Sequence, residues 1–188
     1  MTRSLVMRGR IMLCAGLLVL SNGLAAGAAR AQSDAPEYAV KAAYLYKLGD
    51  YVEWPAATFA APASPLTICV SGDDPFGAAL DGSVGGQKVA GRAIQVRRLA
   101  VAERDSGCQV LYIAGSEGQP VAAALAAVRG APILTVTDAG RGSAKGIVHF
   151  VVQERRVRFE IDDQSAATNG LKISSKLFAL ALSVKPRS

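Results

Sequence analysis

Two cysteines and a single histidine are the side chains outside the N-terminal leader that are most capable of redox or metal chemistry. Cys69 and Cys108 form no C-x-x-C motif, so a thioredoxin-like redox role is not indicated. His149 lies within a β-rich run, where a histidine is more often structural than a general base. Two cysteines and one histidine are too few for a usual zinc site. We therefore predict that the protein holds no metal.

Motifs for nucleophilic or phosphate chemistry are also missing from the sequence. Ser174-Ser175-Lys176 does not have the S-x-x-K spacing, and no G-x-S-x-G elbow occurs. The adjacent Asp162 and Asp163 would point apart at a strand end. The Gly72–Gly77 segment lacks both the G-x-G-x-x-G and P-loop patterns, and its two aspartates would repel an anion. We interpret that segment as a turn and helix cap, and predict a non-enzymatic protein without a cofactor.

The first 31 residues have the layout of a secretory signal peptide. Three arginines precede an apolar run from Ile11 to Leu20, and small residues then lead to Ala31. We predict cleavage after Ala31, which leaves residues 32–188 as one domain. A membrane anchor is less favoured, because the apolar run is shorter than the roughly 20 residues of a spanning helix. Cys14 opens this run instead of ending it, so it does not indicate a lipid anchor.

The charge of the protein changes once this leader is removed. The full chain carries +6 from 21 basic and 15 acidic residues. The leader holds four arginines and no acid, so residues 32–188 carry 17 minus 15, or +2. A strongly basic surface, which nucleic-acid binding needs, is therefore not indicated. We predict an exported protein of the periplasm that does not bind nucleic acid.

Export would place Cys69 and Cys108 in an oxidising compartment, where an even pair of cysteines is a disulfide candidate. The bridge would close a loop of about 40 residues and stabilise the fold by about 3–4 kcal/mol on the chain-entropy model. Two unpaired buried thiols are the alternative that these residues alone leave open.

Hydrophobic periodicity predicts helices that alternate with short strands after a flexible start over 32–36. Glu37 to Trp54 has the apolar spacing of a helix, which Pro55 would end. Further strands are predicted over 66–71, 88–89, 93–99, 110–114, 133–137, 147–152 and 156–161, and helices over 75–80 (capped by Asp74), 119–128, 163–169 and from Ser174 or Ser175 to Val184. This order predicts an α/β fold, with a mainly parallel sheet flanked by helices on both faces, Rossmann-like but without a nucleotide motif, and a C-terminal β-hairpin.

Ligands of such folds often bind beyond the carboxyl ends of the strands. In this chain those places are Gly72–Gly77, Gly115–Gln119 and Asp138–Gly142. We interpret Phe76, within the first of them, as a core residue instead of a ligand platform. A pocket above these strand ends would support the alternative function, a periplasmic small-molecule-binding sensor that serves another signalling or transport system.

Six segments of the exported part form a pattern whose order and spacing are more specific than any one of them. They are Tyr38–Tyr46 with Val52–Pro55, Ile68–Gly77, Cys108–Ile113, Leu134–Asp138, Val157–Ile161 and Gly170–Leu177. In this order they resemble the YfiR family of periplasmic proteins, over nearly the whole exported part from about Tyr38 to Leu182. The chain departs from that family at Gln109, where histidine is common, and in having cysteines for only one disulfide.

The resemblance implies a periplasmic regulatory protein that is commonly a dimer. It implies repression of an inner-membrane diguanylate cyclase through the periplasmic sensor region of that enzyme, which lowers cyclic-di-GMP and restrains biofilm formation. It also implies release when an outer-membrane lipoprotein sequesters the protein or when its disulfide is reduced, and it places the cysteine pair of the family on Cys69 and Cys108.

A regulator of this kind needs a docking surface and no reaction centre. We predict that surface around the C-terminal segment from Glu160 to Lys176, with the Trp54–Pro55 corner as a second candidate, since aromatic residues favour interfaces. The candidate partner-binding residues are Trp54, Glu160, Asp162, Asn169, Lys172, Ser174 and Ser175.

Overall fold

A computed structural model describes residues 25–188 of the protein, with side chains from residue 35 onward. The predicted cleavage point and leader therefore stay predictions, and residues 1–24, which include Cys14, lie outside the described residues. The helices are α1 (Ala25–Leu48), α2 (Ala78–Val84), α3 (Val121–Ala127), α4 (Asp163–Thr168) and α5 (Ser175–Phe178). The strands are β1 (Val52–Glu53), β2 (Leu66–Gly72), β3 (Lys88–Val89), β4 (Arg92–Leu99), β5 (Val110–Gly115), β6 (Leu134–Asp138), β7 (Val148–Gln153), β8 (Arg156–Asp162), β9 (Lys172–Ile173) and β10 (Ser183–Lys185).

Eight of the strands form one mainly parallel sheet in the order β10-β8-β7-β6-β5-β2-β4-β3. β2 lies between β4 and β5 and is parallel to both. Strands β3 and β4 therefore lie on one side of β2, and the later strands of this sheet, from β5 onward, lie on the other. β7 and β8 form the predicted antiparallel hairpin, and β10 adds to β8 in parallel. Strands β1 and β9 pair separately as a small antiparallel sheet.

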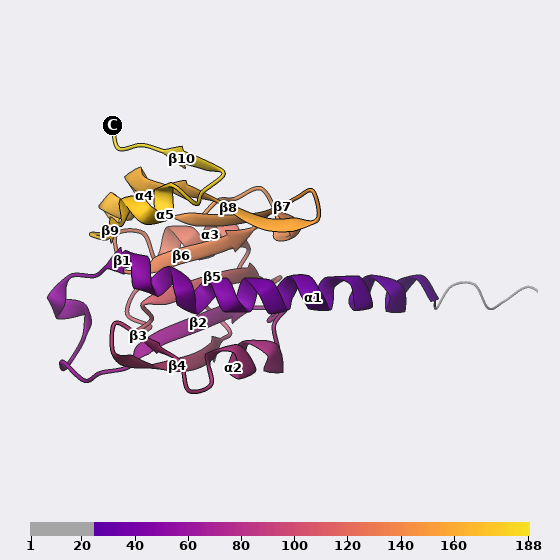
Figure 1. Ribbon diagram of the computed structural model, residues 1–188, viewed down its shortest axis with the longest axis horizontal. Helices are drawn as coiled ribbons and strands as arrows, with labels where there is room; N and C mark the ends of the chain where they lie inside the picture. The colour runs from indigo at the N-terminus through magenta and orange to yellow at the C-terminus, as the bar shows by residue number, and fades with distance from the viewer. Residues whose placement is uncertain (1–24) are drawn as a thin grey trace, which may run out of the picture.

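The helices cover both faces of this sheet, as the sequence predicted. On β2, Ile68 and Val70 belong to a core cluster that includes Leu45 of α1 and Leu80 of α2. Cys69, between them, belongs to the cluster on the opposite face that includes Ala124 of α3. This alternation explains why the sequence of β2 is nearly all apolar, because both of its faces are buried. Figure 1 shows α1 lying across the sheet, with its N-terminal part projecting beyond the strands.

The predicted helix over 37–54 is wrong at both ends. α1 already begins at Ala25, runs through Pro36 and includes the predicted flexible start. It ends at Leu48, where a 3₁₀ turn over Gly49–Tyr51 follows, and the chain then extends as β1. The local apolar spacing continues past Leu48, but pairing of Val52 with Ile173 of β9 determines the extended conformation.

The predicted C-terminal helix to Val184 is also wrong in its length. The Ser174 side chain caps α5 by accepting a hydrogen bond from the backbone N–H of Lys176, as predicted, but the helix ends at Phe178. The chain then forms β10, in which Val184 lies opposite Ile161 of β8. Pairing with a distant strand overrides the local helical pattern.

Asp74 does not cap α2, whose N-cap residue is Gly77. Its carboxylate accepts hydrogen bonds from the backbone N–H groups of Phe76 and Gly77, which closes a local turn before the helix starts. α2 therefore starts at Ala78 and continues to Val84, beyond the predicted end near Leu80. The interpretation of Phe76 as a core residue is confirmed, since only 5% of its surface is exposed.

Among residues 25–188, none of the helices combines the length and apolar character that crossing a bilayer requires.

Candidate functional site

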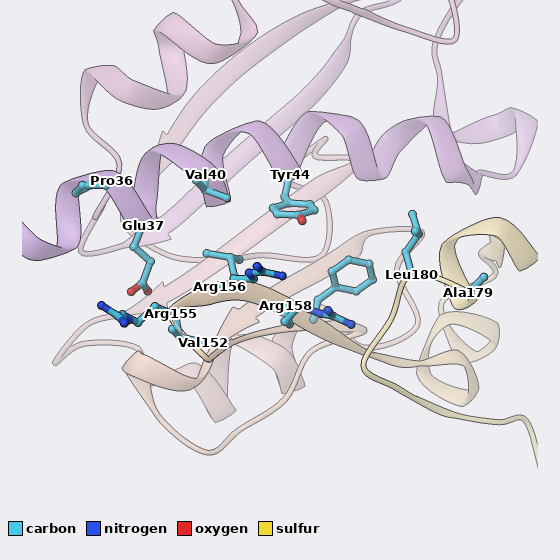
Figure 2. A pocket seen from close by; sticks show the side chains of 12 residues that line it. Pro36, Glu37, Val40, Tyr44, Val152, Arg155, Arg156, Arg158, Ala179 and Leu180 are labelled. Atoms are coloured by element: carbon cyan, nitrogen blue, oxygen red, sulfur yellow. The ribbon is translucent and has the colours of Figure 1, made fainter.

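A groove of about 970 Å³ lies between α1, the β7–β8 hairpin and the chain that follows α5. Val40, Val152 and Leu180 on its walls are 46%, 49% and 55% exposed, which is unusual for aliphatic side chains that lie together. We call it the α1–hairpin groove. Its lining residues are Pro36, Glu37, Val40, Tyr44, Val152, Arg155, Arg156, Val157, Arg158, Phe159, Ala179 and Leu180 (Figure 2).

An aromatic cluster forms the floor of the α1–hairpin groove. The Tyr44 ring of α1 lies 5.9 Å, centroid to centroid, from both Phe150 of β7 and Phe159 of β8. Both phenylalanines are buried, whereas Tyr44 is half-buried. Aromatic pairs at this separation add stability beyond their buried area. They therefore fix the distance between α1 and the hairpin, so the groove is part of the packed structure.

Three arginines lie along the hairpin side of the groove. Arg155 is in the two-residue turn between β7 and β8, where Glu154 and Arg155 both have positive φ values of 52° and 59°. Two such residues in succession are the signature of a type I′ turn, a conformation that residues other than Gly, Asn and Asp adopt at a cost. Figure 2 shows Arg155, Arg156 and Arg158 along the hairpin, with Val40 and Tyr44 pointing toward it from α1.

The charge of the groove is unbalanced. None of Arg155, Arg156 and Arg158 forms an ion pair with a carboxylate among the described residues. The one acidic side chain that lines the groove is Glu37, and its carboxylate already pairs with Lys41. The groove therefore offers apolar surface together with three arginines that lack a partner in the described part of the chain.

A buried polar cluster holds α1 against the carboxyl end of β6. The ammonium of Lys41 lies 2.5 Å from a carboxylate oxygen of Asp138, and both side chains are almost fully buried. Asp138 also accepts hydrogen bonds from the Tyr112 hydroxyl at 3.1 Å and from the backbone N–H of Gly140 at 2.9 Å. Burial and the neighbouring Asp138 raise the pKa of Tyr112, so the phenol stays protonated and remains a donor.

Lys41 stays charged within this cluster. Burial acts to lower the pKa of Lys41, but hydrogen bonds to Asp138 and Glu37 outweigh it, and the net shift is upward. Glu37 and Lys41 lie one turn apart on α1, so the same helix turn supplies both the buried lysine and the acidic wall of the groove. Lys41 could not be recognised from the sequence, because an isolated lysine in an amphipathic helix carries no signal of its distant partner.

The strand ends at which such folds often bind ligands are partly filled in this protein. Gly72 and Gly115, at the ends of β2 and β5, approach so closely that a Cβ on Gly72 would lie 2.3 Å from the Gly115 carbonyl oxygen. The N–H of Asp73 also donates to that oxygen at 3.0 Å. Phe76 packs over this edge against Tyr112, with ring centroids 4.7 Å apart. Backbone contact and aromatic packing thus occupy part of this edge, and a hollow of about 340 Å³ lined by Asp73, Ser116 and Arg141 remains beside them.

The two cysteines and the histidine have structural surroundings. Cys69 and Cys108 form the predicted disulfide, with their Cα atoms 5.9 Å apart, between β2 and the residues that lead into β5. The Nδ1 atom of the buried His149 lies 2.8 Å from the Thr137 hydroxyl oxygen, and burial lowers the pKa of His149. Among the described residues there is no group of three or more His, Cys, Asp or Glu side chains placed to hold a metal ion.

The predicted partner-binding residues do not come together as one surface. Lys172, opposite Glu53 in the β1–β9 pair, lies near the Trp54 corner with Ser174 and Ser175. Glu160 and Asp162 lie on β8, where Glu160 pairs with Lys145 and Asp162 pairs with Lys185. Asp162 also caps α4 through the backbone N–H of Ser165.

Asn169 is the one buried member of the predicted set, with 7% of its surface exposed. Its side-chain amide donates to the Ile133 carbonyl at 2.9 Å and accepts from the N–H of Gly130 at 2.8 Å. These bonds tie the end of α4 to the segment between α3 and β6. The groove residues themselves were not among the predicted sites, although the Arg155-Arg156-Val157-Arg158 run was visible in the sequence.

A comparison with protein-family models connects this fold to a known family. The model for DUF4154, described as YfiR/HmsC-like, matches residues 38–182. The chain belongs to the YfiR/HmsC-like family. No curated protein matches it.

Membership of the YfiR/HmsC-like family confirms the resemblance drawn from the six sequence segments. Proteins of this family are periplasmic regulators of cyclic-di-GMP signalling that interact with a membrane signalling protein, and they are regulators instead of enzymes. The groove between α1 and the hairpin falls within the matched residues except for Pro36 and Glu37.

Proposed function

We propose that this protein represses an inner-membrane diguanylate cyclase by binding the periplasmic sensor region of that enzyme at the α1–hairpin groove. Repression would lower cyclic-di-GMP and so restrain biofilm formation. The proposal includes export with removal of residues 1–31, a homodimeric domain over 32–188 and sequestration by an outer-membrane lipoprotein.

The observation that carries this proposal is the exposed apolar groove with its unpaired arginines. Val40, Val152 and Leu180 remain exposed in a domain that buries most of its other aliphatic side chains in two cores. Exposed apolar surface with a polar rim is typical of protein-interaction sites. A smaller hollow of about 340 Å³ at the strand ends, lined by Asp73, Ser116 and Arg141, is the corresponding feature for the alternative function, a small-molecule sensor.

Complementation of a deletion strain tests the proposal. Loss of the gene should raise cellular cyclic-di-GMP, measured by mass spectrometry, and the wild-type gene should restore the low level. The double variant Val40→Glu/Leu180→Glu should fold but fail to restore it, because two carboxylates would replace apolar contact surface. Val101→Glu is the matched control, since Val101 is 48% exposed but does not line the groove.

Two results would count against the proposal. An unchanged cyclic-di-GMP level in the deletion strain would show that the protein does not repress a diguanylate cyclase. Full repression by the Val40→Glu/Leu180→Glu variant would show that the groove is not the binding site. The Glu160–Lys176 segment and Trp54 would then be the remaining candidate surface, and Lys172→Glu would test it.

A further inference from the structure

One edge of β8 is free beside the α1–hairpin groove. β10 pairs only with Glu160, Ile161 and Asp162, and no other described strand pairs with the β8 edge before Glu160. The first part of β8, from Arg156 to Arg158, is therefore paired with β7 on one side only. An unpaired strand edge is a template for another strand.

The backbone groups of Val157 point to this free edge. The Phe159 carbonyl accepts a hydrogen bond at 2.8 Å from the N–H of Leu182, which precedes β10, so Phe159 directs its polar groups away from β7. Backbone groups of alternate residues in a strand point to the same side. The N–H and the C=O of Val157 are thus available to an incoming strand.

The groove lining extends beyond this edge. Leu180, two residues before the Leu182 that bonds Phe159, lines the same groove as Val40 of α1 and lies farther along it, beyond Tyr44 (Figure 2). A strand placed beside Val157 would therefore have apolar side chains within reach from both α1 and the segment after α5. Burial of these exposed side chains would contribute to binding.

We propose that the groove takes an extended acidic segment of the partner protein, which adds as a strand to the free edge of β8 at Val157. Because side chains alternate along a strand, those of the added segment would stand in turn beside Val157 and beside Arg156 and Arg158. Apolar side chains of the added segment suit the positions beside Val157. Carboxylates suit the positions beside Arg156 and Arg158, because these arginines form no ion pair in the described part of the chain. The inference rests on the proposed function, because it needs a protein partner at this groove.

A short synthetic peptide that alternates valine and glutamate is the probe, and its binding to the full exported domain is measured by fluorescence anisotropy. It should bind about tenfold more tightly than the matching valine–lysine peptide, because only the first complements the arginines. Arg156→Glu should abolish that preference. Arg129→Glu, an exposed arginine at the end of α3, should leave it unchanged.

Val157→Pro tests the strand pairing itself. Proline is tolerated on an edge strand whose N–H faces solvent, but it removes the donor that an added strand needs. Peptide affinity should fall about tenfold, as expected for a lost backbone hydrogen bond and a steric block. Hydrogen exchange at the Val157 amide of the unmodified protein gives an independent readout, since bound peptide should slow it.

Equal binding of the two peptides, or an unprotected Val157 amide in the presence of the valine–glutamate peptide, would overturn strand addition. These failures are separable from failure of the proposed function. If Val40→Glu/Leu180→Glu abolishes repression in cells while the Val157 amide stays unprotected, the groove binds its partner in another way. If that double variant represses normally, the groove itself is excluded.

Discussion

The Lys41 ammonium of α1 lies 2.5 Å from the Asp138 carboxylate at the end of β6, and both side chains are inside the protein. This ion pair joins residues 97 positions apart in sequence. It anchors the helix that forms one wall of the α1–hairpin groove. Its energetics can be tested because removal of one charge leaves the other buried.

Asp138→Asn should lower the free energy of unfolding by about 3 kcal/mol, because it leaves the buried Lys41 charge with Glu37 alone. Adding Lys41→Met to that variant should recover part of the loss, since the buried ammonium that had lost its main partner is then removed as well. Urea denaturation followed by circular dichroism measures both. Lys47→Met, on the exposed side of the same helix, serves as the control and should change little.

The disulfide should account for a large share of the stability. The double variant Cys69→Ala/Cys108→Ala should lose about 3–4 kcal/mol, because the unfolded chain is no longer constrained by a cross-link between residues 39 positions apart. Dithiothreitol should lower the urea midpoint of the wild-type protein toward that of the variant. A midpoint of the wild type that does not respond to reductant would contradict the prediction.

His149 should make the protein less stable as the medium becomes acidic. Burial, with a contribution from Lys145, lowers the pKa of His149 in the folded state below its ordinary value. The unfolded chain therefore binds a proton first as pH falls below about 6.5, and stability should decrease from there down through the folded-state pKa.

The check on this pH dependence is a series of thermal melts of wild type and His149→Gln between pH 8 and pH 5. Glutamine can still bond the Thr137 hydroxyl, but it does not titrate. The variant should therefore lose less stability than the wild type over this range. Parallel curves for the two proteins would contradict the assignment.

Asn169→Ala should destabilise the domain by about 1–3 kcal/mol, because it leaves the Ile133 carbonyl and the Gly130 N–H without their partner. Chemical denaturation of the variant gives this difference. Lys172→Ala, three residues along and exposed, should be nearly neutral. If Asn169→Ala were as stable as Lys172→Ala, the amide would not have the structural role that its hydrogen bonds indicate.

The sheet was predictable from the sequence because its signals are local. The apolar runs at Leu66–Gly72 and Val110–Gly115 are buried on both faces, and the Arg156–Asp162 strand follows a two-residue turn. The ends of elements were less predictable. The chain leaves the helix at Leu48 and extends at Ser183–Lys185 because of pairing with β9 and β8, which no local pattern encodes.

The site was harder to predict than the fold for the same physical reason. The α1–hairpin groove combines Val40, Tyr44, Arg156 and Leu180, which come from three separate segments. Each of them reads alone as an ordinary surface or core residue. Their shared exposure depends on where the hairpin ends relative to α1, which follows from the sheet order and not from the sequence pattern.

The disulfide and the floor of the α1–hairpin groove belong to different hydrophobic cores of the domain. Cys69 and Cys108 lie in the cluster beneath α3, whereas the aromatic floor of the groove belongs to the cluster beneath α1. Loss of the bridge under reducing conditions should therefore lower the number of folded molecules through stability, since the disulfide does not contact the aromatic floor of the groove.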